Sequence, residues 1–129
     1  MNGTVVVAAA VIEKEGRFLV TRRQPGVHLE GFWEFPGGKC EPGEDHRTCL
    51  ARELNEELAV SVRVGDEVFT TTHVSQDGVV ELHFLRCHLL GRPRPQVGQE
   101  IRWVSRHDLR TLQFPPADAE LIRLLTHEG

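Results

Sequence analysis

One segment, residues 37–60 (GGKCEPGEDHRTCLARELNEELAV), constrains the fold of this chain more than any other. It begins with glycines and a Pro-Gly pair, which are typical of a loop, and continues with apolar residues at helical spacing. We expect a helix from about Asp45 to Leu58, with Asp45 or Glu44 as its N-cap. The apolar stripe that should face the core consists of Leu50, Ala51, Leu54 and Leu58.

The same helix carries three glutamates, Glu53, Glu56 and Glu57, on an arc of about 100°. Like charges at these spacings cost ~0.2–0.5 kcal/mol per pair, and negative charge near a helix C-terminus opposes the helix dipole. A solvated helix face is the ordinary explanation of acidic residues, but it leaves these penalties uncompensated. A hard divalent cation would compensate them, because Mg²⁺ prefers carboxylate and phosphate oxygens. The preceding glycines let backbone approach a ligand, and Lys39 offers a charge to phosphate.

Size, charge and composition limit the classes of protein to which the chain can belong. Its 129 residues fit one domain, residues 1–129, and its net charge of −4 argues against stable binding of nucleic acid. No apolar run approaches the length of a membrane span. Three cysteines without paired CxxC spacing argue against a disulfide framework or a structural zinc site and favour a reducing cytoplasm. Seven scattered histidines show no metal-binding motif, so a histidine metal site is not expected.

The rest of the chain alternates between strand patterns and turns. The strand patterns are Val5–Ile12, Arg17–Arg23, Trp33–Phe35, Val62–Val74, Val79–Leu90 and Ile101–Val104. The first two should pair as a hairpin, and so should the two long strands on either side of residues 76–78. Loops are expected at residues 24–32 and 39–44, and a last helix from Pro116 to Thr126. This order predicts an α+β fold, with a mixed sheet covered by helices on both faces.

The spacing within residues 37–60 resembles the Nudix box, GX5EX7REUXEEXGU. Gly38 is followed after five residues by Glu44, and after seven more by the run RELNEELAV at 52–60. Every fixed position of the pattern is matched except Ala59, where the pattern has glycine. Alanine carries a backbone penalty there if its φ is positive, but no ligand is lost. Four further segments are similar to the MutT branch of this family: VTRR at 20–23, WEFPGGK at 33–39, IRWVS at 101–105 and FPPAD at 114–118.

The resemblance implies an α/β/α sandwich and a Mg²⁺- or Mn²⁺-dependent hydrolase that releases pyrophosphate and a nucleoside monophosphate. It also implies site residues. The expected metal ligands are the Gly37 carbonyl and the side chains of Glu53, Glu56 and Glu57. The expected catalytic residues are Glu53, which is the candidate for activating water, Glu56, and Arg52, which should orient the carboxylates by hydrogen bonds. Arg23, Gly38 and Lys39 are expected beside the substrate phosphates.

The nucleotide base should be selected outside the box, near His28, Phe35 and Asp118. Phe35 would stack on the base or belong to the core, and His28 would contact substrate or lie in an exposed loop. Asp118 is either the N-cap of the last helix or a reader of the base. Oxidised-guanine enzymes of this branch have asparagine at that position, which donates and accepts, whereas ionised aspartate only accepts. Burial would return a donor to Asp118 by raising its pKa.

The leading function is therefore nucleotide-pool sanitisation by hydrolysis of 8-oxo-dGTP, and the alternative substrate is CTP or a modified dCTP. A catalytically silent, nucleotide-binding sensor is disfavoured, because such modules usually lose box carboxylates and this chain keeps all of them. Glu100 is a weak candidate for a second general base. We expect a cytoplasmic monomer or weak dimer whose partner is the small nucleotide substrate.

Overall fold

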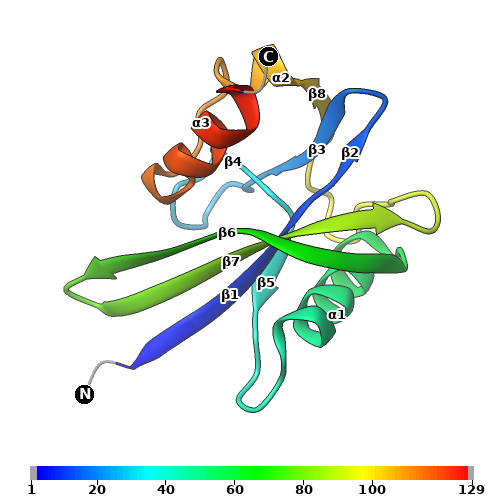
Figure 1. The fold of residues 1–129 in the computed structure, drawn as a ribbon. Helices are drawn as coiled ribbons and strands as arrows, with labels where there is room; N and C mark the ends of the chain where they lie inside the picture. Colours follow the sequence, from blue (N-terminus) through cyan, green and yellow to red (C-terminus); the bar gives the residue numbers. More distant parts are fainter. Residues whose placement is uncertain (1–2, 128–129) are drawn as a thin grey trace.

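The structure, a computed structural model, describes residues 3–127 and contains two sheets and three α-helices within them (Figure 1). The strands are β1 (Thr4–Val11), β2 (Glu13–Lys14), β3 (Arg17–Arg22), β4 (Trp33–Glu34), β5 (Gly37–Lys39), β6 (Val62–Ser75), β7 (Gly78–Leu89) and β8 (Ile101–Ser105). The helices are α1 (His46–Leu58), α2 (Arg106–Leu109), the 3₁₀ helix η1 (Pro116–Asp118) and α3 (Ala119–His127). None of the described helices is long and apolar enough to cross a membrane.

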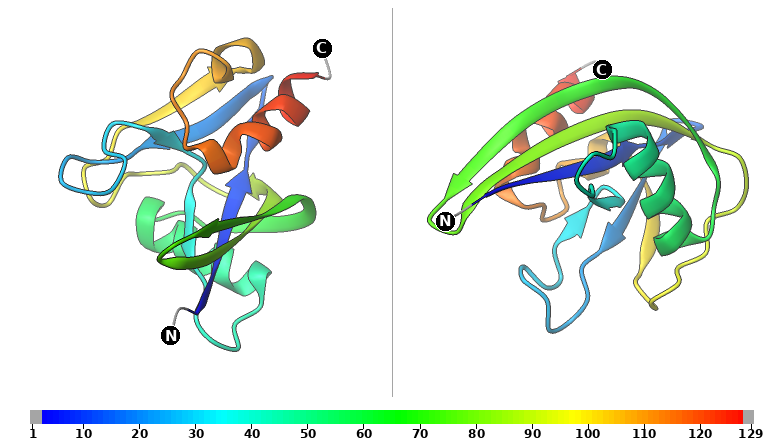
Figure 2. Two further views of the ribbon diagram at one scale, coloured as in Figure 1. Left: turned by 90° about the vertical axis from the view of Figure 1, so that its left-hand side faces the viewer. Right: turned by 90° about the horizontal axis from the view of Figure 1, so that it is seen from below.

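The first sheet is mixed and has the order β5-β1-β7-β6, with β1 parallel to β7 and the other pairs antiparallel. Successive residues of β1 point to opposite faces of this sheet. Ala8 and Ala10 pack into the core cluster under α1, whereas Ala9 and Val11 pack into the cluster under α3. Figures 1 and 2 show α1 and α3 on opposite sides of β1 and β7. The predicted mixed sheet with helices on both faces is confirmed.

The second sheet corrects one predicted pairing. Residues Val5–Ile12 do not form a hairpin with Arg17–Arg23, because β1 lies between β5 and β7 in the first sheet. The chain crosses to the second sheet after β1, and only the two-residue strand β2 pairs with β3. β3 then pairs with β4 and with β8. The inner half of β1 is buried, which is the environment of a central strand rather than of a hairpin edge.

Two further elements were missed, and two were predicted well. β5 was expected to be loop, and α2 was not predicted. The long hairpin of β6 and β7 is confirmed, with residues 76–77 as its turn. α1 begins one residue after its N-cap, Asp45, whose side chain accepts a hydrogen bond from the Thr48 N–H at 2.8 Å. Glu44, the other candidate cap, instead pairs with Arg52.

The C-terminus of α1 is closed by Ala59 in the left-handed conformation, with φ 50° and ψ 42°. This is the positive φ at which an alanine in place of glycine carries a penalty. Its N–H donates to the Asn55 carbonyl at 2.9 Å, so the turn itself is formed.

Replacing Ala59 with glycine should raise the free energy of unfolding by about 0.5–1 kcal/mol. The left-handed conformation costs an L-residue roughly 1–2 kcal/mol, and glycine avoids this cost. Glycine also increases the conformational entropy of the unfolded chain, which offsets part of the stabilisation. Ala59 is exposed, so little packing is lost. Urea denaturation measures the change, with Ala119→Gly as the control. Ala119 is right-handed, with φ −58°, and its replacement should destabilise the protein. Destabilisation by both changes would contradict the argument.

Candidate active site

The glutamates of α1 face two glycines of β5. A Cβ atom on Gly38 would lie 2.1 Å from Oε2 of Glu53, so only glycine leaves room for that carboxylate. A Cβ atom on Gly37 would lie 2.0 Å from the Ala8 carbonyl oxygen. The backbone N–H of Gly37 donates a hydrogen bond to the Glu57 carboxylate. The glycine pair therefore brings β5 into direct contact with the acidic face of α1.

Arg52 links the loop and the helix through its guanidinium group. It binds both carboxylate oxygens of Glu44, at 2.8 and 2.9 Å, and it donates to Glu53 at 3.0 Å and to Glu56 at 3.1 Å. It also donates to the Lys39 carbonyl at 3.1 Å. These hydrogen bonds hold the pKa of Glu44 down at about 2. One side chain thus sets the positions of three carboxylates and of the loop backbone.

Glu57 does not receive a hydrogen bond from Arg52, and the charged form of its carboxyl group is disfavoured. Burial raises the pKa of Glu57 to about 8, and the charges of Glu34 and Glu53 act in the same direction. A divalent cation beside Glu57 would remove this penalty. The side chains gathered here offer oxygen donors alone, which suits Mg²⁺ or Mn²⁺ better than a softer metal. The residues present therefore fit the metal that the sequence predicted.

A pocket of about 200 Å³ opens beside Glu57. Glu34 and Arg23 lie in its wall and form an ion pair at 2.7 Å, and Thr21, Val97 and Gln99 complete that side. Arg23 was predicted to meet phosphate, and the structure places it within reach of the acidic cluster. Glu34 was missed. Glu34 directly precedes the segment Phe-Pro-Gly-Gly, whose glycines were expected to approach the ligand. This position in the sequence could have predicted that Glu34 lies near the glutamates of α1.

The other predicted substrate residues are distributed differently. Lys39 is exposed at the end of β5. His28 is exposed in the loop between β3 and β4, and its carbonyl accepts a hydrogen bond from Arg23. Phe35 is buried, with its ring stacked on Phe114 at a centroid distance of 5.4 Å and edge-on to Phe84 at 6.0 Å. Of the two alternatives for Phe35, this packing favours a core residue.

Asp118 is 5% exposed, in the 3₁₀ turn that precedes α3. Among residues 3–127 no group donates a hydrogen bond to its carboxylate, so the N-cap alternative lacks its defining contact. Burial raises the pKa of Asp118 to about 7, and the charge of Glu34 adds to this effect. Glu100 is exposed and already pairs with Arg102 at 2.9 Å and with Arg22 at 3.5 Å.

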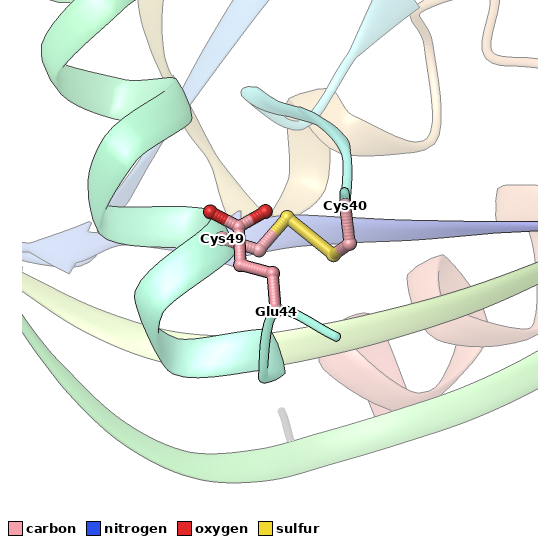
Figure 3. Close-up of side chains that lie close together, drawn as sticks. All are labelled: Cys40, Glu44 and Cys49. Carbon is pink, nitrogen blue, oxygen red and sulfur yellow. A yellow bond between two sulfur atoms is a disulfide. The ribbon is translucent and has the colours of Figure 1, made fainter. Parts of the chain in front are cut away.

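Cys40 and Cys49 form a disulfide, with their Cα atoms 5.1 Å apart (Figure 3). The expectation that the cysteines form no disulfide was therefore wrong for this pair, and Cys87 is the one free cysteine among the described residues. Nine positions separate the pair along the chain, but the loop after β5 turns back beside the start of α1. Figure 3 shows the Glu44 side chain next to this bridge. The disulfide closes the same loop that Arg52 clamps.

Reduction of this disulfide should lower the free energy of unfolding by about 2.5 kcal/mol, because the closed loop is short. The measurement is urea denaturation of the parent chain with and without a thiol reductant. The control is the Cys40→Ser, Cys49→Ser double variant, whose stability should not respond to the reductant. A parent chain equally stable in both conditions would show that the bond contributes nothing in solution.

Comparison with known proteins agrees with this geometry. A family model described as the NUDIX domain matches residues 7–124. The chain is 36% identical to the 8-oxo-dGTP diphosphatase of Haemophilus influenzae, over 96% of this chain and 93% of that protein. It is 34% identical to the CTP pyrophosphohydrolase of Escherichia coli, over 91% of this chain and 86% of that protein. The solution structure of the DNA mismatch repair protein MutT from methicillin-resistant Staphylococcus aureus has a TM-score of 0.80 and 34% identity, and the match covers 100% of both chains.

Proposed function

The chain belongs to the Nudix hydrolase family, and we propose that it hydrolyses a nucleoside triphosphate to the monophosphate and pyrophosphate with Mg²⁺. The observation that carries this proposal is the contact between β5 and α1. There Gly38 leaves room for Glu53, Gly37 donates to Glu57, and Arg52 holds Glu53 and Glu56. This contact gathers oxygen donors on a rigid helix, as a site for a metal-chelated polyphosphate requires.

Each residue has a separate role in this proposal. The ligands of the metal are Glu53, Glu56, Glu57 and the Gly37 carbonyl. Mg²⁺ bound there supplies charge neutralisation for the phosphates and lowers the pKa of water in the site. Glu53 accepts the proton of the attacking water, and Arg52 keeps that carboxylate oriented. Arg23, which lines the same pocket as Glu57, and Lys39, which follows Gly38 on β5 and is exposed, bind the phosphate oxygens.

The leading substrate is 8-oxo-dGTP, which would make this a nucleotide-pool sanitising enzyme of the cytoplasm. The relative from H. influenzae is named for that substrate. CTP or a modified dCTP is the second candidate, and Asp118 is the observation that favours it. An ionised carboxylate accepts from an exocyclic amine, and the E. coli relative is named a CTP pyrophosphohydrolase.

The experiment that tests this function is a pyrophosphate-release assay with Mg²⁺ on a panel of triphosphates: 8-oxo-dGTP, dGTP, CTP and 5-methyl-dCTP. We expect kcat/KM for 8-oxo-dGTP, or else for CTP or 5-methyl-dCTP, to exceed that for dGTP by at least about tenfold, which corresponds to ~1.4 kcal/mol of discrimination. Turnover that disappears with a chelator and returns with Mg²⁺ identifies the metal. No turnover of any triphosphate would overturn the proposal.

Asp118→Asn should remove a pH dependence of base preference. Below about pH 7 Asp118 carries a proton and both donates and accepts, as asparagine does, and above it the ionised group only accepts. In the parent enzyme the ratio of kcat/KM for 8-oxo-dGTP to that for CTP should fall roughly tenfold between pH 6 and pH 8, about the value of one hydrogen bond. In the Asp118→Asn variant this ratio of kcat/KM values should stay, at both pH values, at the value that the parent has at low pH.

The ratio of two substrates cancels any pH effect on the common chemistry. Asp108→Asn, at an exposed carboxylate of α2, is the matched control and should behave as the parent does. A ratio that is flat in the parent, or equally steep in Asp118→Asn, would remove Asp118 from base recognition.

A further inference from the structure

A second cluster of ligating side chains lies at the opposite end of α1 from the proposed catalytic glutamates. His46 is the first residue of α1, Glu67 lies on β6 and His83 on β7. One ligand atom from each of these side chains lies within 4.8 Å of the other two. His46 precedes Glu53 by seven positions, which is ~10 Å along a helix. This cluster, here called the His46 site, is therefore separate from the active site.

Local structure explains why these side chains meet. Glu67 lies between two register shifts in the pairing of β6 with β7, and a β-bulge of this kind redirects a side chain. The rings of His46 and His83 stack with a centroid distance of 3.7 Å. The Nδ1 atom of His46 lies 4.0 Å from the nearer Glu67 oxygen, and the same oxygen is hydrogen-bonded to Nδ1 of His83.

His83 is oriented as a metal ligand usually is. It is 6% exposed, and its second ring nitrogen, Nε2, contacts the Glu81 carboxylate at 2.7 Å. A divalent cation would bind between the Nδ1 atom of His83 and the Glu67 carboxylate, which already contact each other. Glu81 would keep the Nε2–H bond that fixes the ring, the arrangement typical of histidine bound to zinc.

We propose that the His46 site binds a divalent transition metal, Zn²⁺ by preference, through His46, Glu67 and His83. Two imidazoles and one carboxylate suit Zn²⁺ rather than Mg²⁺, and they leave a fourth position for water. Tetrahedral zinc needs ligand atoms about 3.3 Å apart, so the cluster closes by ~1 Å on binding. The side chains of His46 and Glu67 are 37% and 43% exposed and can make that movement. The neighbouring cation, Arg47, is engaged with the Val64 carbonyl at 2.6 Å.

Space and charge also favour an ion here. A pocket of about 290 Å³, lined by Asp45, His46, Arg47, Glu67 and Leu85, opens onto the site and gives an ion a route from solvent. Glu67 and Glu81, the two carboxylates that contact His83, together carry the charge that balances a dication. The bound ion would join the start of α1 to β6 and β7.

The test is a Zn²⁺ titration of the full, oxidised chain against a chromophoric chelator, in excess Mg²⁺ to occupy the active-site carboxylates. The parent should bind one Zn²⁺ at the His46 site. His46→Ala should weaken this binding at least about 100-fold. Glu81→Gln, which removes only the orienting contact, should weaken it about tenfold. The matched control is His88→Ala, at an exposed histidine of β7, the strand that also carries His83. It should leave the affinity for Zn²⁺ unchanged.

Two controls separate the His46 site from other metal sites. Co²⁺ bound to the parent should show the intense visible absorption of a tetrahedral complex, and His46→Ala should lose it. His46→Ala should also keep the parent's Mg²⁺-dependent hydrolysis and thermal stability without zinc, because its ring is half-buried rather than in the core. Zinc binding that survives in His46→Ala, or that is lost in Glu57→Gln instead, would overturn the proposal, as would no binding by the parent.

Discussion

Replacing Glu53 with glutamine should lower kcat by at least about 100-fold, with little change in stability. Glutamine keeps the size of the side chain and its fit against Gly38, but it loses the charge that binds metal and the site that accepts the proton of water. The Glu53 carboxylate is 16% exposed and bonded to Arg52 at 3.0 Å, so solvent cannot easily replace it. Pyrophosphate release under saturating substrate and Mg²⁺ measures the effect.

The matched control for this change is Glu41→Gln. Glu41 also lies near Arg52, at 3.8 Å, but its side chain is 66% exposed and belongs to the loop before α1. Its replacement should change kcat less than about twofold, as expected for an exposed pair. Glu53→Gln with nearly full activity would show that the reaction occurs elsewhere, whatever the family of the chain.

Gly38→Ala should lower kcat by about 100-fold while the protein stays folded. The added Cβ would lie 2.1 Å from Oε2 and 2.3 Å from Cδ of Glu53, so the carboxylate must move away. The atoms that must move are the end of a flexible side chain, so the cost appears in the site rather than in the core. A displacement of about 1 Å of a reacting group is enough for a loss of this size.

Gly91→Ala is the control for the cost of adding a methyl group. A Cβ atom there would meet Val60 at 3.7 Å, which is ordinary contact. Both variants should unfold within a few degrees of the parent, and only Gly38→Ala should lose activity. The affinity for Mg²⁺ should also weaken in Gly38→Ala, because Glu53 is a proposed ligand. Parent-like activity in a folded Gly38→Ala variant would show that the position of Glu53 is not critical.

Contacts between segment 37–60 and the rest of the chain show why sequence reasoning had limits. Glu34 lies on β4 and Glu57 on α1, and only the packing of β5 against the helix places both at one pocket. Asp118 has its pKa raised to about 7 by burial and by Glu34, and neither cause is local in the chain. The hairpin assigned to β1 failed for the same reason. Strand pattern indicates a strand, but the choice of partner depends on which residues the rest of the fold buries.

The cysteines and histidines show a second kind of limit. Motif reasoning looks for ligands at short, regular spacings, and neither group has one. Cys40 and Cys49 meet because the loop between β5 and α1 folds back on the first turn of the helix. His46, Glu67 and His83 come from three elements, and a β-bulge aims the middle one. Spacing along the chain carried no information about either contact.

The sequence by itself determined the acidic face of α1, its glycine loop, its Asp45 cap and the family to which the chain belongs. These features are local, because the helical repeat alone places residues three and four apart on one face. Only the tertiary structure decided which residues surround those glutamates, namely Gly38 and the pocket that contains Glu34. It alone also produced the burial of Asp118, the disulfide and the His46 site. Each of these joins residues that are distant along the chain, and burial and strand pairing, rather than local conformation, bring them together.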